Sequence, residues 1–290
     1  MILTHALAYQ AHGADIVGCS DIVTSKAKKF ATRWEIPFYT NNTNKLLKAT
    51  NPQVVSICVP SKYSAPIIQD CLNHASVTSL LIEKPFGVNL RQAQHLKKII
   101  KRTNKSVIIN YFRAFDAFYI ELEKLHRDGK FGNIMKVVIH YSGFAIENAS
   151  HFLERMISML GNPKSQFRNP THSRNPTFTV SFKNIDCLFI NHKDTKYSDF
   201  EINLYYKDNK IRILDTLGKC ETFQAVQDPN FPSYYILSRK SLLKVTQPDH
   251  QSLSVVVKNA LFQTKQSKKN RELLERAFLC TKLFDEMKIV

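Results

Sequence analysis

The sequence shows no long hydrophobic segment, no signal-peptide pattern in its opening residues and no paired cysteine motif. No uninterrupted apolar run approaches the roughly 18 residues that span a bilayer, so we expect no membrane segment. The opening MILTHALAYQAHG has no basic stretch and no small-residue cleavage site, which argues against a signal peptide. The six cysteines are scattered without a CxxC pair, and Cys19 and Cys58 sit in apolar, strand-like runs. This usage predicts reduced, buried thiols in a cytoplasmic protein, with neither a disulfide framework nor a metal site.

Acidic residues are also scarce. The chain has 24 aspartates and glutamates against 41 lysines and arginines, which gives a net charge of +17. Such a field attracts anions, including phosphates, nucleotides and nucleic acid. The basic residues are dispersed, and the clusters at Lys97–Lys105 and Lys265–Arg271 contain no interleaved aromatic residues. We therefore expect solvated faces there and no nucleic-acid partner.

The first 110 residues alternate short apolar runs with amphipathic segments. Strands are expected at 14–21, 52–60, 77–83 and 105–112, and helices at 24–35, at 64–75 and after an N-cap at Asn89. Continuous apolar strands that alternate with helices predict a parallel sheet covered on both faces, joined by right-handed crossovers. Ligands bind beyond the carboxyl ends of such strands, which is where Glu83 and Lys84 stand.

After about residue 116 the pattern changes to a helix, a strand, a second helix, a series of alternating β-forming runs and a long closing helix. The sequence therefore predicts an α/β chain with two domains. Residues 1–116 would form a Rossmann-like, doubly wound parallel sheet, and residues 117–290 an α+β domain with a mostly antiparallel, open sheet.

Two segments carry residues suited to proton transfer. Lys84, at the end of a buried strand, is open to desolvation that lowers its pKa toward a useful range, or it is a surface lysine paired with Glu83. In ENASHFLERMISMLG, a polar stripe runs beside an apolar helix face and contains Glu147, His151, Glu154 and Ser158. His151 is a candidate proton shuttle, although such a stripe is usually the solvated side of a helix.

Asp21 follows an early strand of this pattern. An acidic residue in that place accepts hydrogen bonds from the ribose hydroxyls of a dinucleotide, or it caps a turn.

These pieces, in this order, resemble the Gfo/Idh/MocA family of NAD(P)-dependent sugar oxidoreductases. The resemblance lies in DIVGCSD, VVSICVPS, LLIEKPFGVN, INYFRAF, GKFGNIMKV, NASHFLERMISMLG and the closing helix. It implies a Rossmann domain followed by an oligomerising α/β domain, a cofactor that is NAD or alternatively NADP, and a sugar or nucleotide-sugar substrate. A homo-oligomer, dimer or tetramer, is expected on the same ground.

The resemblance also implies residue roles. Lys84 would lie near the nicotinamide ribose and the reacting hydroxyl, His151 would be the matching acid or base, and Glu147 would occupy the family's acidic position four residues before it. The implied cofactor contacts are Asp21, Pro60, Ser61, Glu83, Lys84, Asn110 and Arg113.

The sequence departs from the family pattern in three places. The family's first strand and its glycine-rich loop are missing, so the chain starts inside the following helix, with His5 at the family's matching position. Glu147 replaces the more usual aspartate, and Ser64 stands where a histidine is often found.

Three hypotheses follow. The first is an oxidoreductase that acts on a secondary hydroxyl by hydride transfer, with a mis-set start codon or descended from such an enzyme. The second is a truncated, non-catalytic relative that binds a sugar or a partner subunit without redox turnover. The third, a nucleic-acid-binding module, rests on net charge alone. If a dinucleotide binds, Asp21 predicts a preference for NAD, because its carboxylate repels the 2′-phosphate of NADP.

Overall fold

A computed structural model of the chain describes residues 4–164, 167–168, 174–192, 195–215, 218–240 and 252–289. The chain divides into two compact units, the first formed by residues 1–112 and 251–282 and the second by residues 113–250 and 283–290. The sequence had predicted one break after residue 116. The structure differs because the C-terminal helix α8 (Ser252–Phe262) and most of α9 (Lys268–Glu286) return to the first unit.

The first unit is built from parallel strands that alternate with helices, as predicted. Its elements before the return are α1 (His5–Ala11), β1 (Cys19–Ser20), α2 (Thr24–Arg33), β2 (Tyr39–Thr40), α3 (Thr43–Thr50), β3 (Val54–Ile57), α4 (Ser61–Asn73), β4 (Ser79–Ile82), α5 (Leu90–Lys101) and β5 (Ser106–Ile109). The strands form a sheet in the order β3-β4-β5 and a separate pair, β1-β2, and all pairings are parallel. The run expected over 14–21 is a strand only at its end, and β2 and α3 were not predicted.

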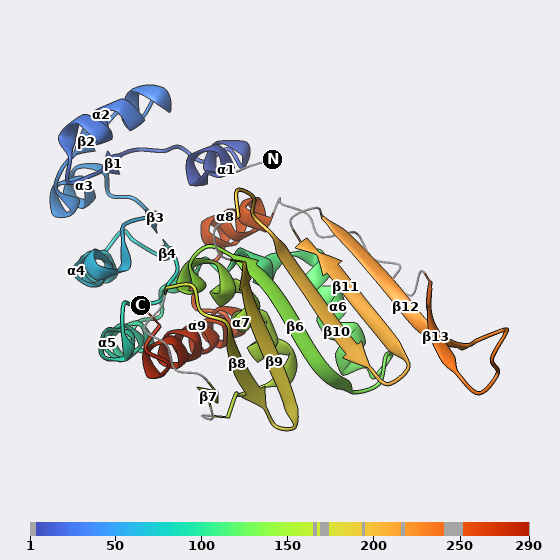
Figure 1. Cartoon of the computed structure of the whole chain (residues 1–290). Helices are drawn as coiled ribbons and strands as arrows, with labels where there is room; N and C mark the ends of the chain where they lie inside the picture. The colour runs from blue at the N-terminus through green and yellow to red at the C-terminus, as the bar shows by residue number, and fades with distance from the viewer. Residues whose placement is uncertain are drawn as a thin grey trace. The chain divides into compact units, whose positions relative to one another are not determined.

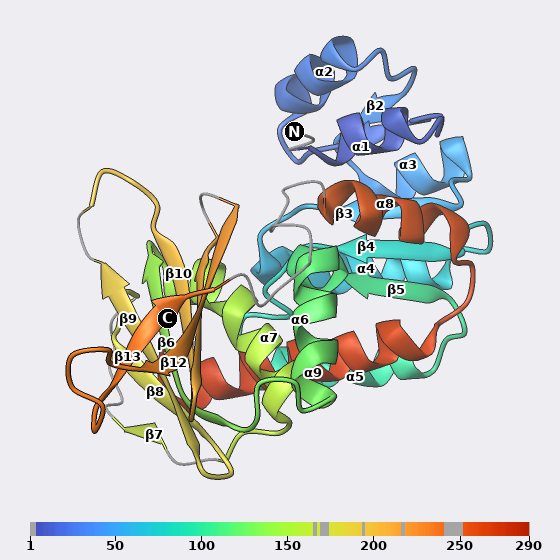
Figure 2. The ribbon, with the colours of Figure 1, turned by 90° about the vertical axis from the view of Figure 1, so that its right-hand side faces the viewer.

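The central sheet is covered on both faces. Strands β4 and β5 are buried along their whole length. Helices α4 and α5 lie on one side of the sheet and α1 and α8 on the other (Figures 1 and 2). The predicted start of α5 is confirmed, since the Oδ1 of Asn89 accepts a hydrogen bond from the amide of Gln92 at 2.9 Å.

The return of the C-terminal helices follows from what a parallel sheet requires, which is apolar cover on both faces. Helix α8 packs on β4, β5 and α1. The Nδ2 of Asn270, in α9, donates to the Oγ of Ser106 at 3.1 Å, and Glu275 forms ion pairs with Lys97 at 2.5 Å and Lys101 at 2.8 Å. These contacts fasten α9 to α5 and to the start of β5.

The second unit contains one large sheet with helices on one face (Figure 2). Its strands follow the order β13-β12-β11-β10-β6-β9-β8-β7, and every pair is antiparallel except β6 with β9. The bounds are α6 (Ala117–Arg127), β6 (Ile134–Ser142), α7 (Ser150–Leu160), β7 (Phe167–Arg168), β8 (Phe178–Phe182), β9 (Ile185–His192), β10 (Phe200–Tyr206), β11 (Asn209–Leu214), β12 (Lys219–Gln227) and β13 (Tyr235–Arg239). The predicted mostly antiparallel sheet is confirmed.

Alternation along the strands sets the two faces of this sheet. On β6, Val137, Ile139 and Tyr141 are buried, whereas His140 between them is only half-buried. The core beneath is aromatic. It includes a stacked pair, Phe178 on β8 and Phe189 on β9, whose ring centroids lie 4.5 Å apart.

One prediction about the cysteines is wrong. All six thiols are free, but Cys58 is exposed, because β3 ends at Ile57 and Cys58 already lies beyond the sheet. Cys71, Cys187 and Cys280 are buried. Among the helices of the described residues, none combines the length and the hydropathy needed to cross a membrane.

Candidate functional site

Polar side chains gather in the first unit where β3, β4 and β5 end. Glu83 directly follows β4 and Asn110 directly follows β5. The Oε1 of Glu83 accepts a hydrogen bond from the Nδ2 of Asn110 at 2.7 Å and lies 2.8 Å from the Nε2 of His5, the first residue of α1. The sequence placed Glu83 at a strand end but Asn110 within the strand expected over 105–112. In the structure β5 ends at Ile109, and the two side chains are in contact.

A second layer of hydrogen bonds holds His5. Its Nδ1 lies 3.0 Å from the Oγ of Ser56, and that hydroxyl lies 2.7 Å from the hydroxyl of Tyr9, one turn further along α1. Because Ser56 belongs to β3, these bonds fix the helix to the sheet edge. In the sequence His5 stands out only for its position, because nothing there shows which distant residues it meets.

The electrostatics of this cluster favour a charged pair. Burial alone would lower the pKa of His5, but hydrogen bonds and charge interactions with Cys58 and Glu83 raise it to about 10. Burial would raise the pKa of Glu83, yet the hydrogen bonds from His5 and Asn110, aided by the charge of Lys84, keep it below its ordinary value. His5 is therefore an imidazolium, and Glu83 a carboxylate, at neutral pH.

Lys84, the neighbour of Glu83, is half-buried and joined to Pro85 by a cis peptide bond. The turn at Pro85 is tied to the start of α4, since the Oγ of Ser61 donates to the Pro85 carbonyl at 3.0 Å. Pro60 is the N-cap residue of the same helix. The predicted residues Pro60, Ser61 and Lys84 thus belong to one connected edge of the sheet.

Asp21 stands directly after β1 and forms a turn. Its Oδ1 accepts a hydrogen bond from the amide of Val23 at 2.8 Å, ahead of α2. The turn-capping role is therefore present in the structure, and it engages one carboxylate oxygen. It leaves the ribose-binding role open for the other oxygen.

Asn110 supplies a test of whether a dinucleotide fits this edge. Its side chain is 4% exposed, and its Oδ1 has no hydrogen-bond partner within the part of the chain that the structure describes. A buried acceptor without a donor costs about 1–3 kcal/mol. A ligand that carries an amide donor, as nicotinamide does, would satisfy this oxygen, so the residues present fit such a group.

The second unit holds Glu147 and His151 on consecutive helical segments. Glu147 lies in a π-helical turn, Ala145–Ala149, that leads directly into α7. Glu147 is exposed, whereas His151 is only 5% exposed. Because a π-turn is bonded i→i+5, the four-residue step between them does not follow the α-helical spacing assumed from the sequence.

The interpretation of the polar stripe on α7 as a solvated face is wrong. Glu154 is fully buried, and its carboxylate accepts two hydrogen bonds of 2.7 Å from the guanidinium of Arg155. Arg155 also lies 3.4 Å from Glu123 of α6, and Ser158 donates to Glu123 at 2.9 Å. Helix α7 contacts α6 as well as the sheet, so its polar residues are paired inside the unit.

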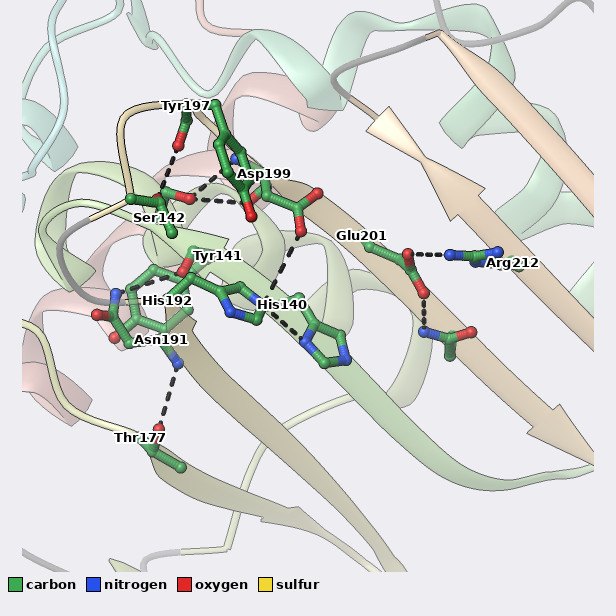
Figure 3. A network of polar contacts seen from close by, with 12 residues as sticks. His140, Tyr141, Ser142, Thr177, Asn191, His192, Tyr197, Asp199, Glu201 and Arg212 are labelled. Carbon is green, nitrogen blue, oxygen red and sulfur yellow. Dashed lines mark hydrogen bonds and ion pairs between the residues drawn. The ribbon is translucent and has the colours of Figure 1, made fainter.

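The segment that joins β6 to the π-turn is pinned by hydrogen bonds (Figure 3). The Oγ of Ser142 accepts from the amide of Asp199 at 2.9 Å, and the Nδ2 of Asn191 donates to the Gly143 carbonyl at 3.0 Å. The Nδ2 of Asn148, inside the turn, donates to the Ser142 carbonyl at 2.7 Å. These hydrogen bonds fix the start of the π-turn, which carries Glu147, and therefore the start of α7, which carries His151.

Two histidines on the same sheet were missed in the sequence. The rings of His140 and His192 stack with centroids 5.1 Å apart, and Asp199 lies 3.9 Å from His192 (Figure 3). The neighbouring Glu201 accepts a hydrogen bond from Arg212 at 2.7 Å. Their positions follow from the β6–β9 register, which the sequence did not supply.

Arg113, predicted at a cofactor site, is engaged inside the second unit. Its guanidinium is buried and bonds the carboxylate of Asp215, which also accepts a hydrogen bond from Tyr119 at 2.5 Å. The guanidinium stacks 4.6 Å from the ring centroid of Phe152. Burial opposes its charge, but Asp215 keeps the pKa of Arg113 above its ordinary value.

Comparison with known proteins gives the site its context. Residues 3–111 match the family model GFO_IDH_MocA, described as an oxidoreductase family with an NAD-binding Rossmann fold. The match confirms the resemblance seen in the sequence over these residues, and the description of that family names NAD as the dinucleotide it binds. An oxidoreductase of Escherichia coli (strain K12), the uncharacterized YhhX, is 24% identical over 140 residues. That alignment covers 43% of this chain and 40% of the relative, so the chain matches less than half of the relative's length.

Solved structures share the fold over nearly the whole chain. The UDP-N-acetylglucosamine 3-dehydrogenase GnnA of Acidithiobacillus ferrooxidans aligns with a TM-score of 0.70 and 14% identity, over 97% of this chain and 94% of that one. The myo-inositol 2-dehydrogenase of Lactobacillus plantarum aligns with a TM-score of 0.71 and 13% identity, over 94% and 91%. At these identities the likeness establishes the fold alone.

Proposed function

We propose that this chain, a member of the Gfo/Idh/MocA oxidoreductase family through its residues 3–111, is an NAD(P)-dependent oxidoreductase that acts on a secondary hydroxyl of a sugar or nucleotide-sugar. The observation that carries the proposal is the buried Oδ1 of Asn110, which has no hydrogen-bond partner among the described residues. It lies beside Glu83 at the carboxyl ends of neighbouring parallel strands. Dinucleotides bind at that edge of such sheets.

In the first unit, we assign cofactor binding to the residues at this edge. Asn110 would accept a hydrogen bond from the nicotinamide amide, and Glu83 holds Asn110 in place for it. Ser61 and Pro60 border the same edge at the start of α4, and Asp21 would take the adenosine ribose with its free carboxylate oxygen. We leave Arg113 out of this set, because its guanidinium bonds Asp215.

Lys84 and His151 are the proposed proton-transfer residues. Lys84 is half-buried and follows a strand, and His151 is a buried imidazole, a group whose charge changes near neutral pH. Glu147 would orient a bound sugar or His151 from the π-turn. A bound nicotinamide supplies the hydride acceptor or donor, while these side chains take or return the hydroxyl proton.

The substrate class rests on the relatives. GnnA is named as a dehydrogenase of UDP-N-acetylglucosamine, and the Lactobacillus plantarum enzyme as a dehydrogenase of myo-inositol. We also propose a homodimer or homotetramer, formed through the face of the large sheet that carries His140 and His192. Sedimentation analysis tests the assembly separately from the activity.

The test of function is a titration of the 290-residue chain with NADH, followed by nicotinamide fluorescence, and then a turnover screen of sugars with NAD. We expect micromolar binding. His151→Gln should keep the binding, whereas Lys84→Ala should weaken it because Lys84 is also a predicted cofactor contact. Both variants should lose about 100-fold or more of the turnover, the usual contribution of a positioned acid or base. Lys98→Ala, an exposed lysine of α5, is the matched control and should change neither.

Two outcomes contradict the proposal. Absence of binding at millimolar NADH would show that this edge does not hold a dinucleotide. Binding without turnover of any sugar would favour the non-catalytic relative that binds a sugar or a partner subunit.

A further inference from the structure

Three side chains with metal-binding atoms converge in the first unit. They are His5 at the start of α1, Cys58 just past β3 and Glu83 just past β4. One ligand atom from each lies within 4.8 Å of the other two, and no other group of this kind occurs within the described residues. An imidazole, a thiolate and a carboxylate are all ligands that zinc accepts.

The spacing suits a small tetrahedral ion. Typical zinc bonds to nitrogen, sulfur and oxygen place neighbouring ligand atoms roughly 3.4–3.6 Å apart. The Nε2 of His5 and the Oε1 of Glu83 are now 2.8 Å apart, and the Sγ of Cys58 lies 3.7 Å from the imidazole Nδ1. Cys58 lies on the Nδ1 side of the ring, so an ion that replaces the proton between His5 and Glu83 needs two adjustments. His5 and Glu83 must separate slightly, and the exposed Cys58 side chain must rotate to carry its sulfur toward Nε2.

The surrounding hydrogen bonds orient the ligands as second-sphere groups do. With Nε2 on the metal, the Nδ1–H of His5 donates to the Oγ of Ser56, which Tyr9 holds at 2.7 Å. Asn110 fixes the Oε1 of Glu83 at 2.7 Å. Metal-bound histidines and carboxylates are usually held by such partners, which fix the tautomer and the direction of the lone pairs.

We propose that His5, Cys58 and Glu83 form a site for a divalent ion of the zinc type, with an open fourth position. Mixed nitrogen, sulfur and oxygen ligands favour zinc over magnesium or calcium, which prefer oxygen alone. Three protein ligands leave a position for water or a hydroxyl group. The ion would fasten α1 to the ends of β3 and β4. The site departs from the sequence prediction of no metal centre, which assumed that Cys58 was buried in a strand.

Cobalt(II) titration of the metal-free, reduced 290-residue chain tests the site without reference to activity. We expect one equivalent of Co²⁺ to bind with the intense visible absorption of a tetrahedral ion and a near-ultraviolet sulfur-to-cobalt band, and Zn²⁺ to displace it. Cys58→Ser should abolish the sulfur band and weaken Zn²⁺ binding at least tenfold. Glu83→Gln should weaken it to a similar degree, and Ser56→Ala should weaken it about 10-fold through the loss of an orienting partner.

Cys220→Ser removes another thiol, in the second unit, and is the matched control that should leave the spectrum unchanged. An unchanged sulfur band in Cys58→Ser would assign the metal to a different thiol and overturn the proposal. If Glu83→Gln and His5→Gln both bind Zn²⁺ with unchanged affinity, the metal is held by a single reactive thiol and the proposed three-ligand site is wrong. Absence of stoichiometric Co²⁺ or Zn²⁺ binding by the unaltered chain would overturn it outright.

Discussion

Asn110 donates a hydrogen bond to Glu83 at 2.7 Å, and the two residues follow the neighbouring parallel strands β5 and β4. The amide nitrogen of Asn110 is thereby occupied, while its buried carbonyl oxygen has no hydrogen-bond partner in the described part of the chain. We predict that Asn110→Ala weakens NADH binding about tenfold, because a hydrogen bond of roughly 1–1.5 kcal/mol is lost. Fluorescence titration measures the change.

The control for this prediction is Asn73→Ala, which removes the same side chain at an exposed position at the end of α4. It should leave NADH affinity unaltered. If Asn110→Ala binds NADH as tightly as the unaltered chain, the free carbonyl oxygen has no part in cofactor binding.

The pair formed by Arg113 and Asp215 is a buried ion pair that should be costly to break. Both side chains are buried, and Tyr119 shares the carboxylate. We predict that Asp215→Ala lowers the free energy of unfolding by about 3–5 kcal/mol, since it leaves the Arg113 guanidinium buried without its counter-charge. Urea denaturation measures the difference.

Asp128→Ala is the matched control, because Asp128 is an exposed aspartate in the same unit. Its effect should stay within about 0.5 kcal/mol. A loss below about 1 kcal/mol in Asp215→Ala would mean that water or a neighbouring group takes over the pairing of Arg113.

Local patterns in the sequence were sufficient to predict several elements of the first unit, although β2 and α3 were missed. The apolar runs that became β4 and β5, and the N-cap at Asn89, depend on residues a few positions apart, so they could be predicted. The same is true of Glu83 and Lys84, whose place at a strand end follows from where the apolar run stops.

The contacts that complete the site could not be predicted from such local patterns, because they join residues far apart in the sequence. His5 meets Ser56 and Glu83, which lie 51 and 78 residues away, and Arg113 meets Asp215 across 102 residues. No periodicity indicates which distant carboxylate will pair with a given base. The burial of Glu154 was missed for a related reason, since the adjacent Arg155 neutralises it inside the unit.

Gly143 has a positive φ of +74°, and a β-carbon there would lie 2.6 Å from the Nδ2 of Asn148. We predict that Gly143→Ala destabilises the second unit in two ways, through the left-handed backbone and through the contact that displaces Asn148 from the Ser142 carbonyl. The first effect costs about 1–2 kcal/mol. Because the junction positions the π-turn, turnover should fall while NADH affinity stays constant.

Gly132→Ala separates the two effects. Gly132 has a similar φ of +79°, but nothing lies within 4 Å of a β-carbon placed there. Its urea-unfolding curve should show the backbone cost alone. Equal losses of stability in Gly132→Ala and Gly143→Ala would show that Asn148 moves aside at no cost.

Glu275 links the stability of the first unit to pH. Burial would raise the pKa of its carboxyl group, but hydrogen bonds from Lys101 and Lys97 hold it below its ordinary value. A lowered pKa in the folded state means that the stabilisation is present above the ordinary carboxyl pKa and is lost as pH falls through the folded value. We predict that Glu275→Gln lowers Tm at neutral pH and that the difference disappears in acid.

The effect should be modest, below about 1 kcal/mol, since the pair is partly exposed. Glu272→Gln is the control. Its partner Lys268 lies 4.0 Å away on the same helix, so the substitution should change Tm little at either pH. A Tm difference for Glu275→Gln that is the same in acid and at neutral pH would assign the effect to packing instead of charge.

Asp21 bears on the choice between NAD and NADP. One of its carboxylate oxygens caps the turn before α2, and the charge remains close to the end of β1. If that edge holds the adenosine ribose, the carboxylate repels a 2′-phosphate, and a repulsion of about 1 kcal/mol corresponds to roughly a fivefold preference for NAD. We predict that Asp21→Ser reduces the ratio of NADH to NADPH affinity by about that factor. Serine can still cap the turn, so the fold should persist.

Asp15→Ser removes an equal charge from an exposed position before β1 and should leave the affinity ratio constant. This control matters because the chain carries a net charge of +17, and any lost acid strengthens the general attraction for a phosphate. If the ratio of NADH to NADPH affinity changes equally in Asp21→Ser and Asp15→Ser, the cause is the net positive charge of the chain and not the position of Asp21. Equal affinity of the unaltered chain for the two cofactors would show that Asp21 does not face the ribose, and its role would be confined to the turn.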